Sequence, residues 1–195
     1  MPSCYPPPVP LPFLTTARLT IRPLTFDHLD AFAAIFADAE TMAAYGRTFT
    51  REESRGWIER SLLRYDRDGF ALFALERTED GLYVGDCGPS IQVVDGVDEP
   101  EIGWHIRRDL WGRGYATESA LALRDWFFDD LGRDRLISLV APSNAASCRV
   151  AEKIGMHVER ETVVFGGPHR VYAMTPGDRS APWDQGAGGP AATGS

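Results

Sequence analysis

The residues that best suit ligand binding or catalysis lie in one stretch, 101–116, which reads EIGWHIRRDLWGRGYA. Its first half has the pattern of an extended segment, Gly112 and Gly114 follow, and a helical pattern begins directly after them. A glycine-bearing turn that runs into a helix points several backbone N–H groups at one spot, and the helix dipole adds positive potential there. The stretch is therefore a candidate pyrophosphate site. A plain glycine turn ahead of a core helix is the alternative.

Two common phosphate-binding motifs do not fit this turn. No Gly-Lys-Ser/Thr follows at the spacing of a P-loop. The third glycine of a dinucleotide-binding fingerprint is absent, and the preceding strands are joined as hairpins. A nucleotide-phosphate binder therefore remains only as a weak alternative.

The elements that must position this turn alternate between strands and helices. Thr25 precedes a helical stripe that starts at Leu29, and Thr50 with Glu53 forms a capping-box pattern before a second helix. The predicted order is β-α-α-β-β-β-α-β-α-β-β, with strands at 17–24, 70–77, 83–94, 100–107, 135–140, 157–164 and 170–175, and later helices at 114–130 and 144–154. This order predicts an α/β fold with a mixed, mostly antiparallel sheet and helices on both faces.

Length and composition indicate one domain with an additional segment at each end. The 195 residues have room for a single core. We expect a proline-rich arm at 1–15, the domain at 16–175 and a flexible Gly/Pro/Ala tail at 176–195, where Trp183 is the one possible anchor. No apolar run reaches the roughly 20 residues of a membrane span. No basic residue precedes Arg18, which argues against a secretory signal and for a cytoplasmic protein.

Charge and cysteine content exclude further classes. The formal net charge of −8 disfavours nucleic-acid binding and suits a cationic substrate. Cys4, Cys87 and Cys148 are scattered and include no CxxC pair, so we expect reduced thiols, no metal site and no cysteine nucleophile.

Three segments carry a resemblance to a known family. Residues 102–119, IGWHIRRDLWGRGYATES, resemble motif A of the GNAT N-acetyltransferases, and 142–156, PSNAASCRVAEKIGM, resemble their motif B. The opening TARLTIRPL at 16–24 is similar to the branch that contains ribosomal-protein-alanine N-acetyltransferases (RimJ/RimL-like). The resemblance implies the GNAT fold, splayed where the strands of Glu101 and Arg135 part. It also implies direct transfer from acetyl-CoA to a primary amine in a ternary complex.

The resemblance also implies which residues hold the coenzyme. The family pattern Q/R-x-x-G-x-G/A falls on Trp111, Gly114 and Ala116, and Trp111 departs from the usual residue, so we expect weakened binding. Arg107 or Arg108 would add positive potential at the mouth. The expected coenzyme contacts are Gly112, Arg113, Gly114, Tyr115, Ala116 and Thr117 around the pyrophosphate, and Trp104, Ile106 and Asn144 along the pantetheine.

The general acid is expected on the helix at 144–154 and the general base on the strand at 100–107. The tyrosine that protonates the leaving thiolate in many relatives corresponds to Ala151 here, so Ser147 is expected to supply that hydrogen bond. An α-amine of pKa ~8 costs only about 1.4 kcal/mol to hold neutral at pH 7, so a weak base suffices. Glu101 acting through water is the first candidate and His105 the second, whereas His28, His157 and His169 are expected to be structural.

The acceptor is expected to be a protein or peptide N-terminal α-amine. A small-molecule amine (amino acid, polyamine, amino sugar or antibiotic) is the alternative. A non-catalytic acyl-CoA-binding module is the alternative from another class, because Trp111 and Ala151 depart from the family pattern. We expect residues 50–68 to govern substrate choice, with Trp57 and Tyr65 shared between the core and the acceptor wall. No membrane or nucleic-acid partner is expected, and the protein would be a monomer or homodimer.

Overall fold

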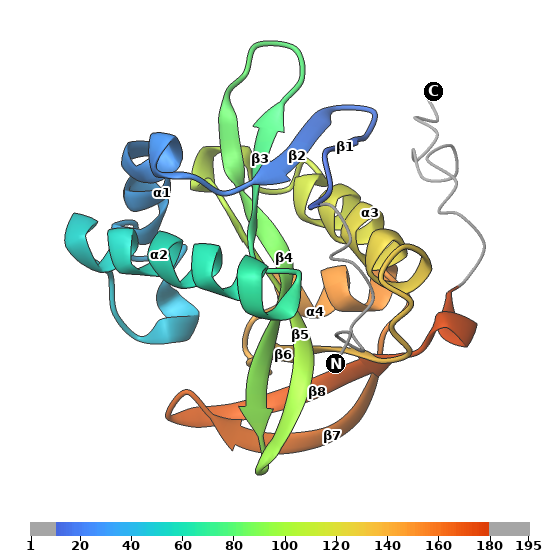
Figure 1. The fold of residues 1–195 in the computed structure, drawn as a ribbon. Helices are drawn as coiled ribbons and strands as arrows, with labels where there is room; N and C mark the ends of the chain where they lie inside the picture. Colours follow the sequence, from blue (N-terminus) through green and yellow to red (C-terminus); the bar gives the residue numbers. More distant parts are fainter. Residues whose placement is uncertain (1–10, 180–195) are drawn as a thin grey trace, which may run out of the picture.

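A single eight-stranded sheet with helices on both faces makes up the fold in the computed structural model, which describes residues 11–179 (Figure 1). The strands lie in the order β1-β2-β3-β4-β5-β6-β8-β7. Their bounds are β1 Leu14–Thr15, β2 Leu19–Pro23, β3 Phe73–Arg77, β4 Tyr83–Val94, β5 Val97–Ile106, β6 Leu136–Val140, β7 His157–Val164 and β8 Gly167–Met174. The helices are α1 Leu29–Phe36, α2 Arg51–Asp68, α3 Tyr115–Asp129 and α4 Ala145–Lys153.

The predicted element order is confirmed, with one strand added at its start. Leu14 and Thr15 pair with Ile21 and Thr20, so the sheet begins before the boundary expected at residue 16. The last strand begins earlier than the predicted residue 170: Phe165 and Gly166 have positive φ, and β8 already begins at Gly167. Cys4 and Trp183 lie outside the described residues.

The second helix begins as its capping box predicts. The Thr50 side chain accepts a hydrogen bond from the Glu53 amide (3.2 Å), and the Glu53 carboxylate accepts one from the Thr50 amide (2.8 Å). On α2, Ile58 lies in the core, while Trp57 and Leu62 are only half-buried. Tyr65 belongs to the core, where its hydroxyl accepts from the Leu24 amide (2.9 Å) and donates to the Leu72 carbonyl.

Two hydrophobic clusters fix the helices against the sheet. Helix α3 buries Trp126, Phe127 and Phe128 against one face, so these aromatic residues are core. Helices α1 and α2 cover the other face through Phe32, Phe36 and their neighbours. In the part of the chain that the structure describes, no helix is both long and apolar enough to span a membrane.

The one parallel neighbour pair of this sheet is β5 with β6, and it is brief. The two strands pair at Glu101 and Ile137, and the Ser138 hydroxyl donates to the Ile102 carbonyl (3.0 Å). No further β5–β6 pair follows among residues 11–179, so the strands diverge and residues 103–106 keep β4 as their only strand neighbour. The backbone N–H and C=O groups on this open strand edge can pair with an extended ligand.

Candidate active site

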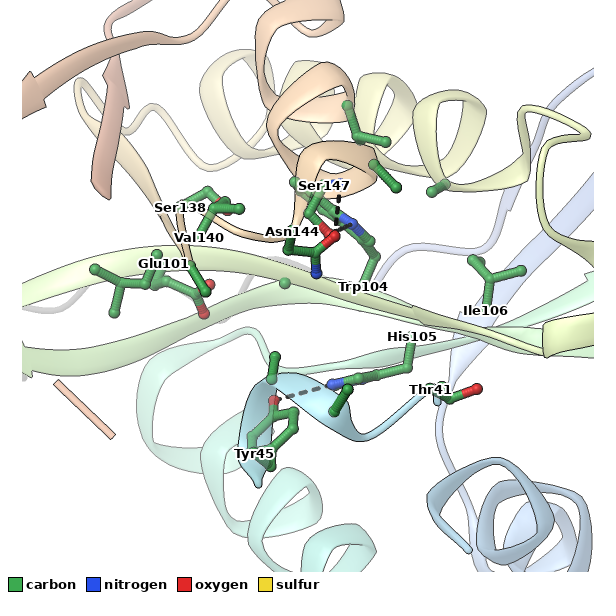
Figure 2. Close-up of a pocket in the computed structure, with 18 of the residues that line it drawn as sticks. Thr41, Tyr45, Glu101, Trp104, His105, Ile106, Ser138, Val140, Asn144 and Ser147 are labelled. Atoms are coloured by element: carbon green, nitrogen blue, oxygen red, sulfur yellow. Dashed lines mark hydrogen bonds between the residues drawn. The ribbon is translucent and has the colours of Figure 1, made fainter. Parts of the chain in front are cut away.

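A cavity of about 860 Å³ lies where β5 and β6 diverge (Figure 2). Helix α4 borders it on one face of the sheet, and α2 with the short helix at Ala43–Tyr45 borders it on the other. Its walls include most of the residues predicted to hold the coenzyme and all three predicted catalytic residues: Glu101, Trp104, His105, Ile106, Gly112, Gly114, Tyr115, Ala116, Thr117, Asn144 and Ser147. Arg113 does not line it.

The glycine turn has the geometry of an anion site. Gly112 and Gly114 have φ of 74° and 83°, a left-handed backbone that side-chain-bearing residues rarely adopt. Gly114 is the N-cap of α3 and offers no side chain, so no side-chain hydrogen bond caps the first amides of that helix. The residues that carry these amides, Tyr115 to Thr117, line the cavity at the positive end of the α3 dipole.

Two side chains, those of Arg18 and Trp111, fix the position of this turn by hydrogen bonds. The Arg18 guanidinium donates to the Arg113 carbonyl (2.9 Å) and to the Glu118 carboxylate (2.7 Å), and it lies over the Tyr115 ring at 4.5 Å. The Trp111 indole N–H donates to the Ile106 carbonyl (2.7 Å). Trp111 therefore ties the turn to the end of β5. The role of Arg18 was not predicted, because the residue lies far from the turn along the chain.

Ser147 and Asn144 stand on α4 above the diverging strands (Figure 2). Asn144 caps α4 by accepting from the Ser147 amide (3.1 Å). The Ser147 hydroxyl accepts from the Trp104 indole at 3.4 Å, a contact that leaves its own proton available. Ala151, at the position of the expected tyrosine, is buried.

Glu101 lies at the fork of β5 and β6, and its environment favours the neutral acid. Burial raises the pKa of Glu101 to about 7, although the Leu139 amide and the charges of His105 and Arg64 act in the opposite direction. The register between β4 and β5 is unbroken from 97 to 106, so Glu101 and His105 share one face of the sheet. A carboxyl group with this pKa can accept a proton near neutral pH.

His105 is held at both ring nitrogens in a buried chain of polar groups. Its Nδ1 lies 2.7 Å from the Asp86 carboxylate, and its Nε2 lies 2.9 Å from the Tyr45 hydroxyl. Burial lowers the pKa of His105, but the charge and hydrogen bond of Asp86 and the charge of Glu101 outweigh it, so the net pKa is raised. His105 and Tyr45 both line the cavity, and both ring nitrogens of His105 already have partners. Neither Tyr45 nor Asp86 was predicted from the sequence.

The remaining side chains considered from the sequence are cysteines and histidines. Cys87 and Cys148 are buried, and burial raises the pKa of Cys87, which disfavours a thiolate. His28 is buried and accepts from the Thr25 amide (2.9 Å), whereas His169 lines the cavity, a position that was not expected. No group of three or more His, Cys, Asp or Glu side chains able to hold a metal occurs among the described residues.

Comparisons with known proteins agree with this geometry. The family model described as an acetyltransferase (GNAT) domain matches residues 18–157. The uncharacterized protein YkkB of Bacillus subtilis is 32% identical over 160 residues, which cover 82% of this chain and 93% of YkkB. An acetyltransferase structure from Agrobacterium tumefaciens has a TM-score of 0.74 at 30% identity, covering 84% of this chain and 94% of the other.

A structure of Mycobacterium smegmatis RimJ in complex with CoA-disulfide shares the fold. Its TM-score is 0.67 at 19% identity, with 82% of this chain and 83% of the other covered. At that identity the likeness concerns the fold alone.

Proposed function

We infer the activity of this chain from one premise: it belongs to the GNAT acetyltransferase family. It is accordingly an acyltransferase of a family that transfers an acetyl group from acetyl-CoA to an amine. Beyond this, we propose that its acceptor is a protein or peptide N-terminal α-amine. The transfer is supported by the opening between β5 and β6, which joins the uncapped amides at the start of α3 to Glu101 and Ser147 in one cavity. The α-amine is supported by the pKa of Glu101, about 7, which suits an acceptor of pKa ~8.

The residues present fit acetyl-CoA. The left-handed glycines and the amides of Tyr115, Ala116 and Thr117 would bind the pyrophosphate, with Arg113 close by in the same turn. The free edge of Trp104 to Ile106 would pair with the amides of the pantetheine, and Asn144 would border it. The acetyl thioester supplies the activated carbonyl, and a backbone amide of β5 would stabilise the oxyanion.

Glu101 is proposed as the general base. Its pKa of about 7 places the carboxylate and the acid in balance at neutral pH, so it can take a proton from the acceptor ammonium directly or through one water. An N-terminal α-amine suits such a base, because its pKa of ~8 lies only about one unit higher.

Ser147 is proposed to donate a hydrogen bond to the departing thiolate. A thiolate needs little help to leave, since the pKa of a thiol is near ~8.5. The Trp104 indole occupies an acceptor position of the Ser147 oxygen and so orients its proton toward other acceptors in the cavity. Ala151 is buried and has no side-chain acid to offer.

His105 is proposed to act through Tyr45. The reaction removes two protons from the acceptor nitrogen, one before attack and one afterwards. Glu101 takes the first. The Tyr45 oxygen can receive the second while its own proton passes to Nε2 of His105, and Asp86 stabilises the imidazolium that results. This path uses contacts already present.

Two alternatives differ from this proposal in testable ways. A small-molecule amine would use the same cavity and the same base. A non-catalytic acyl-CoA-binding module is the alternative that Trp111 suggests, although the Trp111 indole donates to the Ile106 carbonyl and so ties the turn to the end of β5. Turnover of any amine excludes the module.

The test is a screen of acceptors with purified protein and acetyl-CoA, followed by thiol release and mass spectrometry. Peptides with a free N-terminus are expected to gain one acetyl group at the α-amine, and the same peptides with a blocked N-terminus and a free lysine are expected to react far more slowly. Preferential acetylation of lysine side chains would refute the α-amine assignment. Coenzyme binding without turnover of any amine would support the module.

A further inference from the structure

Most arginines of residues 11–179 form an ion pair with a carboxylate. The exceptions within the described chain are Arg60, Arg64, Arg113, Arg133 and Arg149. Arg133 lies over the Phe70 ring at 5.6 Å. Arg113 stands in the glycine turn, and the other three line the cavity. Positive charges without a protein anion thus gather around the site.

These charges divide between the two faces of the sheet. Arg113 and Arg149 lie on the side of α3 and α4, where the proposed coenzyme phosphates account for them. Arg60 and Arg64 lie on α2, across the sheet, on the side where Tyr45 stands (Figure 2). Phosphates held at the start of α3 do not explain a cationic pair on the opposite face.

The pair is part of one stripe of α2 that faces the cavity. Trp57, Arg60 and Arg64 are three and four residues apart, so their side chains lie on the same side of the helix. Arg60 is exposed, with its guanidinium 5.5 Å from the Trp57 ring, and Arg64 is half-buried. The stripe places two cations along the wall that runs toward Glu101.

Holding Arg64 in this position is unfavourable without a ligand. Burial lowers the pKa of Arg64, and the charges of Arg67 and Arg60 lower it further. Asp68 and Glu101 act in the opposite direction, but neither lies within the 4.0 Å of an ion pair with it. A partly desolvated guanidinium without an anion is compensated when a ligand carboxylate accepts its paired N–H groups.

We propose that Arg60 and Arg64 bind a carboxylate of the acceptor, so that the substrates are amines with a carboxylate close to the nucleophilic nitrogen. The inference rests on the proposed function in its general form, acetyl transfer to an amine, and it states which amines are accepted. A peptide source agrees with the proposed α-amine acceptor, and a free amino acid agrees with the small-molecule alternative. Glu101 would face the ammonium and Arg64 the carboxylate, so the cavity complements a zwitterion. Two sources offer this chemistry: a free α-amino acid, and a peptide with an acidic side chain next to its N-terminus. The net charge of −8 had suggested a cationic acceptor, and the ammonium of a zwitterion keeps that feature.

Matched acceptors that differ in one charge test the inference. One pair is alanine and alaninamide, and the other is the peptide amides Ala-Glu-Ala and Ala-Gln-Ala. Rates are measured at pH 8.5, above the pKa of about 7 that Glu101 has beside Arg64. The wild-type protein is expected to prefer the carboxylate member of at least one pair by about 10- to 100-fold in kcat/KM, the effect of one charge-assisted hydrogen bond. The pair that shows the preference identifies the source.

Variants on α2 locate the effect. Arg64→Gln is expected to bring the ratio of kcat/KM within each pair to about one, and Arg64→Lys should retain part of the preference. The ratio is the readout because a change in Glu101 affects both members of a pair alike. Arg67→Gln is the matched control, because Arg67 pairs with Asp68 on the same helix and does not line the cavity. Equal rates within both pairs for the wild-type protein would overturn the inference and leave the proposed function intact.

A binding measurement distinguishes a failure of the carboxylate inference from a failure of the proposed acetyl transfer. Calorimetric titration of the CoA-saturated protein with N-acetylalanine and N-acetylalaninamide needs no turnover. Tighter binding of the carboxylate form by about tenfold, lost in Arg64→Gln, supports the inference even if no amine is acetylated. Equal binding of the two compounds, together with equal acetylation rates, would refute it.

Discussion

Replacing Glu101 with glutamine is expected to make the protein more stable at neutral pH and less active. Burial raises the pKa of Glu101 from 4.5 to about 7. The folded state therefore holds this proton more tightly than the unfolded chain, and the free energy of unfolding falls as the pH rises from 4.5 to 7. The cost is fully present above pH 7. At 1.36 kcal/mol per pKa unit it amounts to about 3 kcal/mol, and about half of that once solvent in the cavity is considered.

Urea unfolding of both proteins at pH 5 and pH 8 measures this cost. The Glu101→Gln variant should exceed the wild type in free energy of unfolding by about 1–3 kcal/mol at pH 8, and most of the gap should vanish at pH 5. Glu159→Gln is a control of opposite sign, because Arg135 lowers the pKa of Glu159 and its loss should destabilise at pH 8.

The acetyl-transfer activity of Glu101→Gln is the second measurement. Acetyl transfer at pH 8 should fall by about 100-fold, the lower end of general-base contributions. The wild-type rate should itself fall about tenfold for each pH unit below 7, as the carboxylate is protonated. A variant that is less stable than the wild type at pH 8, or a stability gap that does not change with pH, would refute the reasoning.

Three further substitutions probe the rest of the site. Ser147→Ala is expected to lower kcat about tenfold with unchanged acetyl-CoA affinity, because one hydrogen bond to the thiolate is lost; single-turnover kinetics and calorimetry measure both, and an unchanged kcat removes Ser147 from the mechanism. Gly114→Val should abolish coenzyme binding, since a β-branched residue is strained at φ 83°; retained affinity in titrations contradicts the anion site. Tyr45→Phe should reduce kcat about tenfold without altering KM, as the path to His105 is interrupted; a pH–rate profile identical to the wild type would count against it.

The sequence predicted the elements and the glycine turn because their signals are local. Capping boxes, alternation and hairpin turns depend on residues close together along the chain, and the Asp95-Gly96 turn even fixes the register of β4 and β5. That register places Asp86 opposite His105, so this buried pair follows from the turn alone, although Asp86 was not among the expected site residues. Residues directly opposite each other in a hairpin share a face.

Long-range contacts explain what could not be predicted. Arg18 reaches Glu118 and the Arg113 carbonyl only after β2 has paired with β3 and α3 has packed on the sheet. Tyr45 meets His105 across a gap of 60 residues in the chain. The stripe of Arg60 and Arg64 has the pattern of a solvated helix face, because nothing local shows that a cavity opens in front of it.

Calorimetric titration with acetyl-CoA, with CoA and ATP as controls, tests the central claim most directly. The geometry predicts micromolar binding of acetyl-CoA and CoA at one site per chain and no heat with ATP, because the amides at the start of α3 and the free edge of β5 are both required. Absence of heat with acetyl-CoA, or equal binding of ATP, would contradict the assignment of this cavity to the coenzyme.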